Sequence, residues 1–178
     1  MTTHHITRLG HQGDGIAKGP FFAPLTLPGE EITGTPDGHT LRDIRFIIPS
    51  PDRVTPPCRH FKSCGGCQLQ HASEDFTARW KRQVVEAALA AHGISAEIGP
   101  VLSSPPGSRR RATLAARRTK KGAMAGFHAR GSDTIIEIPD CHLLHPDLMP
   151  ARPLAGDLAL DGTSRKAPFA VSVTLSLG

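Results

Sequence analysis

The sequence predicts a mixed β and α+β protein, with a small N-terminal β-barrel followed by an α+β domain that has an antiparallel sheet and one main helix. Three observations predict this fold class. Short β-branched stretches alternate with glycine turns over residues 3–49, a proline-rich segment follows at 49–57, and one long amphipathic pattern covers 73–92. Because proline stiffens a connection and cannot donate to a strand ladder, we place the domain boundary there, with domains at 1–55 and 56–178.

Composition excludes several classes of protein. The 178 residues include 18 glycines and 16 prolines, which indicates many turns but not a low-complexity chain. No stretch comes near the roughly 18 apolar residues of a membrane span, and the N-terminus has no leader pattern. We therefore expect a cytoplasmic, monomeric protein with no membrane partner, whose four cysteines are thiols or metal ligands and not disulfides.

Residues 3–49 supply the expected barrel strands. Several short strands at close spacing, separated by turn signals, are typical of a small barrel. The expected strands lie at 5–7, 21–23, 31–33 and 45–48, and the turn signals lie at Gly13-Asp14-Gly15, Pro28-Gly29 and Asp37-Gly38.

The main helix is expected over residues 73–92. Ser73 is a suitable N-cap, acidic residues follow in the first turn, and Gly93 suits the left-handed position after the last turn. An apolar stripe at helical spacing is interpreted as core packing and not as a surface for base stacking. The stripe consists of Phe76, Trp80, Val84 and Ala88.

The remainder of the second domain is expected to be mainly strands. Residues 94–102 read as an extended connection that ends in a Ser-Pro-Gly turn. Strands are then expected at 110–118, 123–129 and 134–138. Residues 170–177 alternate apolar and polar side chains, which predicts an amphipathic strand near the end of the sequence.

Positive charge is concentrated in one segment, residues 109–130, which holds eight basic residues and no acidic one, in a chain of formal charge +5. A basic strand and turn on a folded surface attracts polyanions, so we interpret this segment as a nucleic-acid surface; the alternative is an ordinary solvated face. The candidate RNA-binding residues are Arg109, Arg110, Arg111, Arg117, Arg118, Lys120 and Lys121.

Three cysteines, Cys58, Cys64 and Cys67, have the spacing C-x5-C-x2-C, and Cys141 lies far downstream. A Cys-x2-Cys corner lets two thiolates reach one metal centre, and the two glycines inside it allow close approach of the backbone. Three clustered ligands and one remote ligand fit an iron–sulfur cluster better than zinc, which usually takes paired corners.

The spacing leaves three interpretations of the cysteines open. They hold an iron–sulfur cluster, or they hold zinc with help from one of three histidines, or they are unrelated buried or free thiols. The histidines in question are His60, His71 and His142.

Several segments resemble one known family. Residues 6–19 and 21–30 resemble the TRAM domain, a small RNA-binding β-barrel with an OB-like fold, and residues 58–71, ending in Cys-Gly-Gly-Cys-Gln-Leu-Gln-His, resemble the cluster motif of the uracil-C5 RNA methyltransferases. Residues 109–114, 126–132 and 136–148 are similar to the central domain of that family. The presence of both the barrel and the cluster motif points to the branch of the family that modifies 23S ribosomal RNA.

The resemblance implies a [4Fe-4S] cluster held by Cys58, Cys64, Cys67 and Cys141, with ribosomal RNA as the partner. In this family a further domain binds S-adenosylmethionine, and a cysteine there attacks C6 of uracil before C5 is methylated. Residues 1–178 show no sign of that domain. We therefore expect no catalytic or S-adenosylmethionine-binding residues, and an N-terminal, RNA-recognising fragment of a methyltransferase that is incomplete at its C-terminus and inactive alone.

Two other functions remain as alternatives. The first is a stand-alone, zinc-stabilised RNA-binding module, which metal analysis distinguishes from a cluster protein. The second is a redox sensor that uses the pair Cys64 and Cys67, although the reductase-like βαβ context of such sites is missing.

Overall fold

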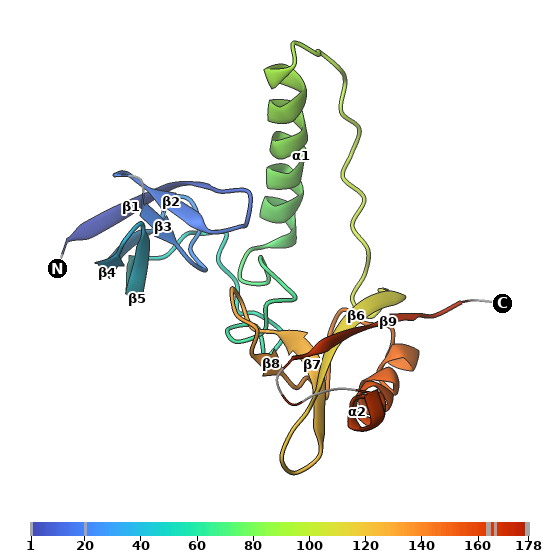
Figure 1. The fold of residues 1–178 in the computed structure, drawn as a ribbon. Coiled ribbons are helices and arrows are strands. Elements are labelled where there is room, and N and C mark those ends of the chain that lie inside the picture. Colours follow the sequence, from blue (N-terminus) through green and yellow to red (C-terminus); the bar gives the residue numbers. More distant parts are fainter. Residues whose placement is uncertain (1, 20, 163–164, 166, 177–178) are drawn as a thin grey trace. The chain divides into compact units, whose positions relative to one another are not determined.

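The computed structural model describes residues 2–19, 21–162, 165 and 167–176 (Figure 1). They form two compact units. Unit 1 contains residues 1–56 and 68–102, and unit 2 contains residues 57–67 and 103–178. The chain first passes from one unit to the other between Pro56 and Pro57.

Unit 1 contains a closed five-stranded barrel, as the sequence predicts. Its strands are β1 (Thr3–Leu9), β2 (Gly15–Ala17), β3 (Phe21–Ala23), β4 (Glu31–Asp37) and β5 (Thr40–Ile48). They are hydrogen-bonded in the order β1-β2-β3-β5-β4, and pairing of β4 with β1 closes the ring. The strand β2 was not expected, because its first residue, Gly15, lies in a sequence that reads as a turn.

Small and branched apolar side chains fill the barrel. Ile6, Ile32 and Leu41 are almost completely buried and pack with Ala17 and Ala23. Gly15 is required by this packing, because a Cβ atom there would overlap Oγ1 of Thr26 and approach Cγ2 of Ile6 to 2.7 Å.

A buried ion pair fastens the proline-rich segment to the barrel. The Glu30 side chain is fully buried and accepts hydrogen bonds from the backbone N–H groups of Leu27, at 2.8 Å, and Ser50, at 3.2 Å. The Arg53 guanidinium binds both oxygens of this carboxylate, with Nη2 2.8 Å from Oε2, and lies 4.2 Å from the centre of the Phe46 ring. The charge of Glu30 is therefore compensated, as a buried carboxylate requires.

The helix α1 (Glu74–Ala91) confirms the expected long helix. Ser73 caps it by accepting a hydrogen bond from the N–H of Phe76, and Gly93 has the expected positive φ of 69°. None of the helix residues, all of which are described, is buried. The interpretation of Phe76 and Trp80 as core residues is therefore wrong. Side-chain hydrogen bonds connect α1 to its unit at the first turns, where Asp52 contacts Ser73 and Arg79.

Unit 2 contains a four-stranded antiparallel sheet. Its strands are β6 (Arg111–Arg118), β7 (Ala123–His128), β8 (Ile135–Ile136) and β9 (Phe169–Thr174), in the order β8-β7-β6-β9. The expected strand at 134–138 is shorter than predicted. The last strand begins at Phe169 and ends at Thr174, and residue 177 of the predicted strand lies outside the described residues.

One face of this sheet is covered by α2 (Ala151–Gly162), a helix that was not predicted (Figure 1). Ala155 and Ala159 are fully buried against a cluster that includes Leu114 of β6 and Ala125 of β7. Pro153 and two glycines disguise this helix in the sequence. Proline is tolerated here because its missing N–H lies in the first turn, where no partner within the helix is available. Neither α1 nor α2 is long and apolar enough to cross a membrane.

Candidate metal centre and nucleic-acid interface

A series of turns shapes the segment that carries three of the cysteines, here called the cysteine loop (residues 58–67). The N–H of Phe61 donates to the carbonyl of Cys58, and the N–H of Cys64 donates to the carbonyl of His60 at 2.8 Å. Phe61 and Cys64 are both buried, so the middle and the end of the turn series are anchored in the unit.

The cysteine loop lies against the end of β7. The N–H of Gly65 donates to the carbonyl of His128 at 2.9 Å, and Cys64 forms a bridge with Ala129. Arg130 donates from Nη2 to the carbonyl of Cys67 at 3.0 Å. A Cβ atom at Gly65 would lie 2.8 Å from the His128 carbonyl oxygen, so this contact requires glycine.

The thiol of Cys64 is buried and lies near other charged and polar groups. Burial raises its pKa, and the nearby sulfurs of Cys58 and Cys141 raise it further. Two groups oppose this: the N–H of Gly66, which donates to Sγ at 3.3 Å, and the positive charge of Arg130. The structure therefore brings Cys64 within electrostatic range of Cys58 and Cys141, although Cys141 is far away in the sequence.

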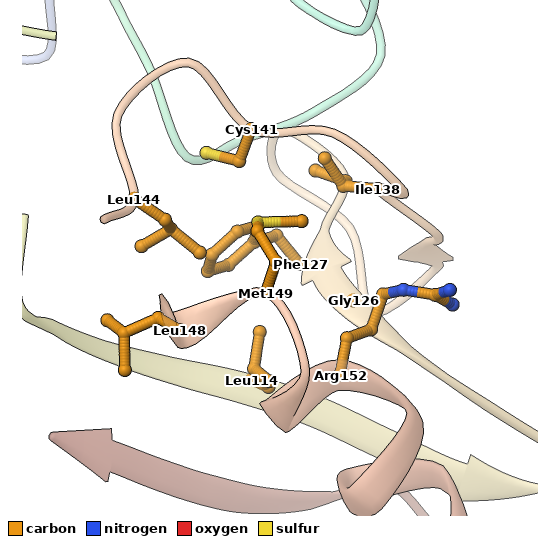
Figure 2. Close-up of a pocket in the computed structure, with 9 residues that line it drawn as sticks. All are labelled: Leu114, Gly126, Phe127, Ile138, Cys141, Leu144, Leu148, Met149 and Arg152. Atoms are coloured by element: carbon orange, nitrogen blue, oxygen red, sulfur yellow. The ribbon is translucent and has the colours of Figure 1, made fainter. Parts of the chain in front are cut away.

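Cys141 lies beside the apolar interior of unit 2. It borders a small cavity of about 10 Å³, which has room for about one water molecule. Figure 2 shows its side chain at one side of this cavity, with Phe127, Leu144 and Met149 around the interior. Cys141 also packs against the cluster formed by Ala112, Leu144 and Leu148. Its position is thus fixed by the core of the unit.

An ionic contact joins the cysteine loop to the segment before Cys141. Nε2 of His60 lies 2.9 Å from Oδ1 of Asp140, and Nη2 of Arg59 lies 3.2 Å from the same oxygen. The hydrogen bond from His60, aided by the positive charge of Arg59, holds the pKa of the Asp140 carboxyl below its usual value.

The three histidines considered as zinc ligands have other surroundings. His60 contacts Asp140, and His71 lies in unit 1 whereas the cysteines lie in unit 2. His142 is exposed, and its carbonyl accepts a hydrogen bond from the N–H of Gly107.

The cysteine donors fit a thiolate-bound metal in their chemistry and not in their arrangement. In the part of the chain that the structure describes, no three His, Cys, Asp or Glu side chains lie close enough together to hold a metal ion. The features that fit such a group are chemical: four cysteines within one unit, the electrostatic effect of Cys58 and Cys141 on Cys64, and a backbone N–H directed at one sulfur.

The basic residues predicted from the sequence lie along β6 and the turn that follows it. Arg109 and Arg110 precede the strand and form backbone hydrogen bonds. The N–H of Arg109 donates to the carbonyl of Leu143, and the carbonyl of Arg110 accepts from the N–H of Leu175. Arg117 is half-buried beside Met124, and the other six are exposed. Within the described residues, none of the seven pairs with an acidic side chain.

Two functional contacts could not be found from the sequence. Arg130 belongs to the basic segment by position, but its guanidinium points to the cysteine loop and not to a basic surface. Asp140 pairs with a residue 80 positions away. The sequence signal for this second contact was the position of Asp140 directly before Cys141.

Comparison with known proteins gives relatives of one kind. No protein-family model matches the chain. A protein of Rhizobium meliloti named as an uncharacterized RNA methyltransferase is 39% identical over 184 aligned residues, which are 97% of this chain and 44% of the relative. A 23S rRNA (uracil(1939)-C(5))-methyltransferase of Vibrio cholerae is 36% identical over 155 residues, which are 80% of this chain and 35% of that protein.

One solved structure has a similar fold. It is the tRNA (uracil-54, C5)-methyltransferase of Pyrococcus abyssi in complex with S-adenosyl-L-homocysteine, with a TM-score of 0.53 and 24% identity over 83% of this chain and 34% of that one. The chain therefore spans less than half the length of the relatives that it matches.

Proposed function

We propose that residues 1–178 are the RNA-recognising part of an RNA uracil-C5 methyltransferase that acts on 23S ribosomal RNA with S-adenosylmethionine as methyl donor. The observation that carries this proposal is the alignment of nearly the whole chain with proteins named RNA methyltransferases. The basic segment supports the same partner, since its side chains have no acidic neighbours on their strand and turn. The stand-alone zinc module is not favoured, because the relatives are named as enzymes.

We assign RNA binding to this part of the protein, and not methyl transfer. The methylation of uracil at C5 begins with a cysteine nucleophile in the family that the sequence resembles. All four cysteines of the chain lie in unit 2. A cysteine that ligates a metal group is not available to attack a base.

We further propose that Cys58, Cys64, Cys67 and Cys141 hold a [4Fe-4S] cluster. Such a cluster would supply a covalent link between the cysteine loop and the segment around Cys141, and would stabilise unit 2 as metal sites do. The protein's own contribution is to hold the loop on β7 through Gly65 and to direct the N–H of Gly66 at a sulfur.

RNA binding is tested by fluorescence anisotropy with a labelled fragment of 23S ribosomal RNA at several salt concentrations. We expect binding that weakens steeply as salt rises, because phosphate contacts release counterions. Absence of binding at low salt would contradict the assignment. Incubation with S-adenosylmethionine and RNA should give no methyl transfer by this chain alone.

The metal group is tested separately. Protein purified without oxygen should be brown and should contain about four iron and four sulfide ions per chain. Colourless protein with one tightly bound zinc ion would refute the cluster but leave RNA binding intact, so the two proposals fail independently.

A further inference from the structure

Successive side chains of β6 point to opposite faces of the unit 2 sheet, so the basic residues of this strand are divided between the two faces. Ala112, Leu114 and Ala116 point to the face that packs against α2 and the neighbouring core. Arg111, Thr113 and Arg117 therefore point to the opposite face, because successive side chains of a strand alternate. We call this second face the open face.

Neighbouring strands extend the open face. The register pairs Arg111 with Thr174, Thr113 with Ser172 and Arg117 with Met124, and paired residues share a face. The pair of Ala115 with Gly126 and Ala170 lies on the same face. The open face thus consists of Arg111, Thr113, Ala115, Arg117, Met124, Gly126, Ala170, Ser172 and Thr174.

Most of this face is accessible. Arg111, Thr113, Ser172 and Thr174 are exposed, whereas Arg117 and Met124 are half-buried and Ala115 is buried. Toward β8 the face is covered, because the backbone carbonyl of Ile136 occupies the place where a Cβ atom of Gly126 would be. The accessible region therefore lies along β9 and the first residues of β6, and Arg117 lies beyond the buried Ala115, toward the free end of the β6–β7 hairpin.

We infer that the open face binds RNA through the phosphate backbone, with Arg111 and Arg117 as the principal contacts; this inference rests on the proposed RNA-binding function. Charge complementarity identifies the partner, because β6, β7 and β9 contain no Asp or Glu. The acidic residues Asp157 and Asp161 lie on α2, which covers the other face. A polyanion on the open face therefore meets no acidic side chain of these strands, whereas on the helix side it meets the two aspartates of α2.

The side chains on the open face determine the mode of contact. Thr113 and Ser172 place their hydroxyl groups 3.3 Å apart between the arginines, and hydroxyls and arginines are the usual partners of phosphate oxygens. The aromatic residues of these strands, Phe127 and Phe169, pack on the α2 side and offer no surface for stacking bases. The open face consequently holds RNA by its backbone without reading its sequence.

The spacing of the two arginines suits an extended strand of RNA. They are six residues apart on β6, which corresponds to about 20 Å at ~3.3 Å per residue, so they contact phosphates of different nucleotides. Each contact adds separately to the salt dependence of binding.

The test compares two double variants with equal loss of charge. Arg111→Gln/Arg117→Gln changes the open face, and Arg110→Gln/Arg118→Gln changes the adjacent positions on the helix side. Binding is measured by anisotropy with two labelled single-stranded RNAs of equal length and unrelated sequence, and folding is checked by thermal melting. The first variant should bind both RNAs about tenfold more weakly, with a salt slope reduced by about 1.4 for two lost contacts.

The second variant should lose less than about threefold, through the general field of the protein alone. Equal losses in both variants would overturn the role of the open face but leave RNA binding by the basic segment intact. Failure of the unmodified protein to bind either RNA would refute the proposed function itself.

A third variant tests the face by gain of charge. Ser172→Lys places a new cation on β9, beside Thr113 of β6. It should increase the affinity for both RNAs. Unchanged affinity in this variant, with normal melting, would also contradict the inference.

Discussion

Nε2 of His60 lies 2.9 Å from Oδ1 of Asp140, so two side chains 80 positions apart in sequence join the cysteine loop to the segment that carries Cys141. Arg59 contacts the same carboxylate oxygen. The contact is on the surface, with the Asp140 side chain 55% exposed, and it joins the residue before Cys141 to the cysteine loop.

Replacing Asp140 should loosen the cysteine loop locally. In Asp140→Ala the N–H of Cys64, which donates to the His60 carbonyl, should exchange with solvent faster, by less than about fivefold because exposed ion pairs contribute little. Amide hydrogen exchange followed by mass spectrometry or NMR measures this. Asp147→Ala is the control, since Asp147 pairs with His145 at the short helix η1 (Pro146–Leu148), away from the cysteine loop in sequence. Uniformly faster exchange over all of unit 2 would contradict a local role.

Two glycines of unit 2 should respond to alanine in opposite directions. A methyl group at Gly126 would overlap the carbonyl oxygen of Ile136, so Gly126→Ala should destabilise the unit by about 2–4 kcal/mol or rearrange β8. Gly156 lies within α2, and its Cβ would only touch Ala123 at 4.0 Å. Gly156→Ala should stabilise the unit by about 0.5–1 kcal/mol. Urea unfolding measures both, and equal effects would refute the tight contact at Gly126.

The buried carboxylate of Glu30 should be essential for the barrel. In Glu30→Gln the Arg53 guanidinium loses its ionic partner, and the cost should be about 2–4 kcal/mol, less than for a completely buried pair because the Arg53 side chain is 22% exposed. The adjacent Glu31→Gln is the control, since the ion pair of Glu31 is with the exposed His5 and its loss should cost less than about 1 kcal/mol. Similar denaturation midpoints for the two variants would show that the Glu30 charge is dispensable.

Local signals in the sequence were sufficient for the barrel and the main helix. Ser73 and Gly93 mark the ends of α1 by cap chemistry, which depends only on neighbouring residues. The helix α2 was missed because Pro153 looks like a helix breaker unless its place in the first turn is known. The packing of Phe76 and Trp80 could not be predicted, because periodicity shows that a face is apolar but not what covers it.

The candidate site was predictable in composition but not in arrangement. Spacing alone grouped Cys58, Cys64 and Cys67, whereas the approach of Cys141 to Cys64 depends on the fold between them. Likewise the run of arginines identified a basic strand, but its division between two faces depends on which alternate residues pack against α2.

The cluster proposal makes Cys141 the residue whose loss is most informative, because it alone lies outside the cysteine loop. Cys141→Ser should lose iron and sulfide and melt several degrees lower, since the link between the loop and the core of unit 2 would be missing. Iron analysis, the visible absorption spectrum and thermal melting measure these effects. The neighbouring His142→Ala should keep its iron, because His142 is exposed and is not an expected ligand. Full iron content and an unchanged melting temperature in Cys141→Ser would contradict the assignment, and metal loss in His142→Ala would instead favour a zinc site with a histidine ligand.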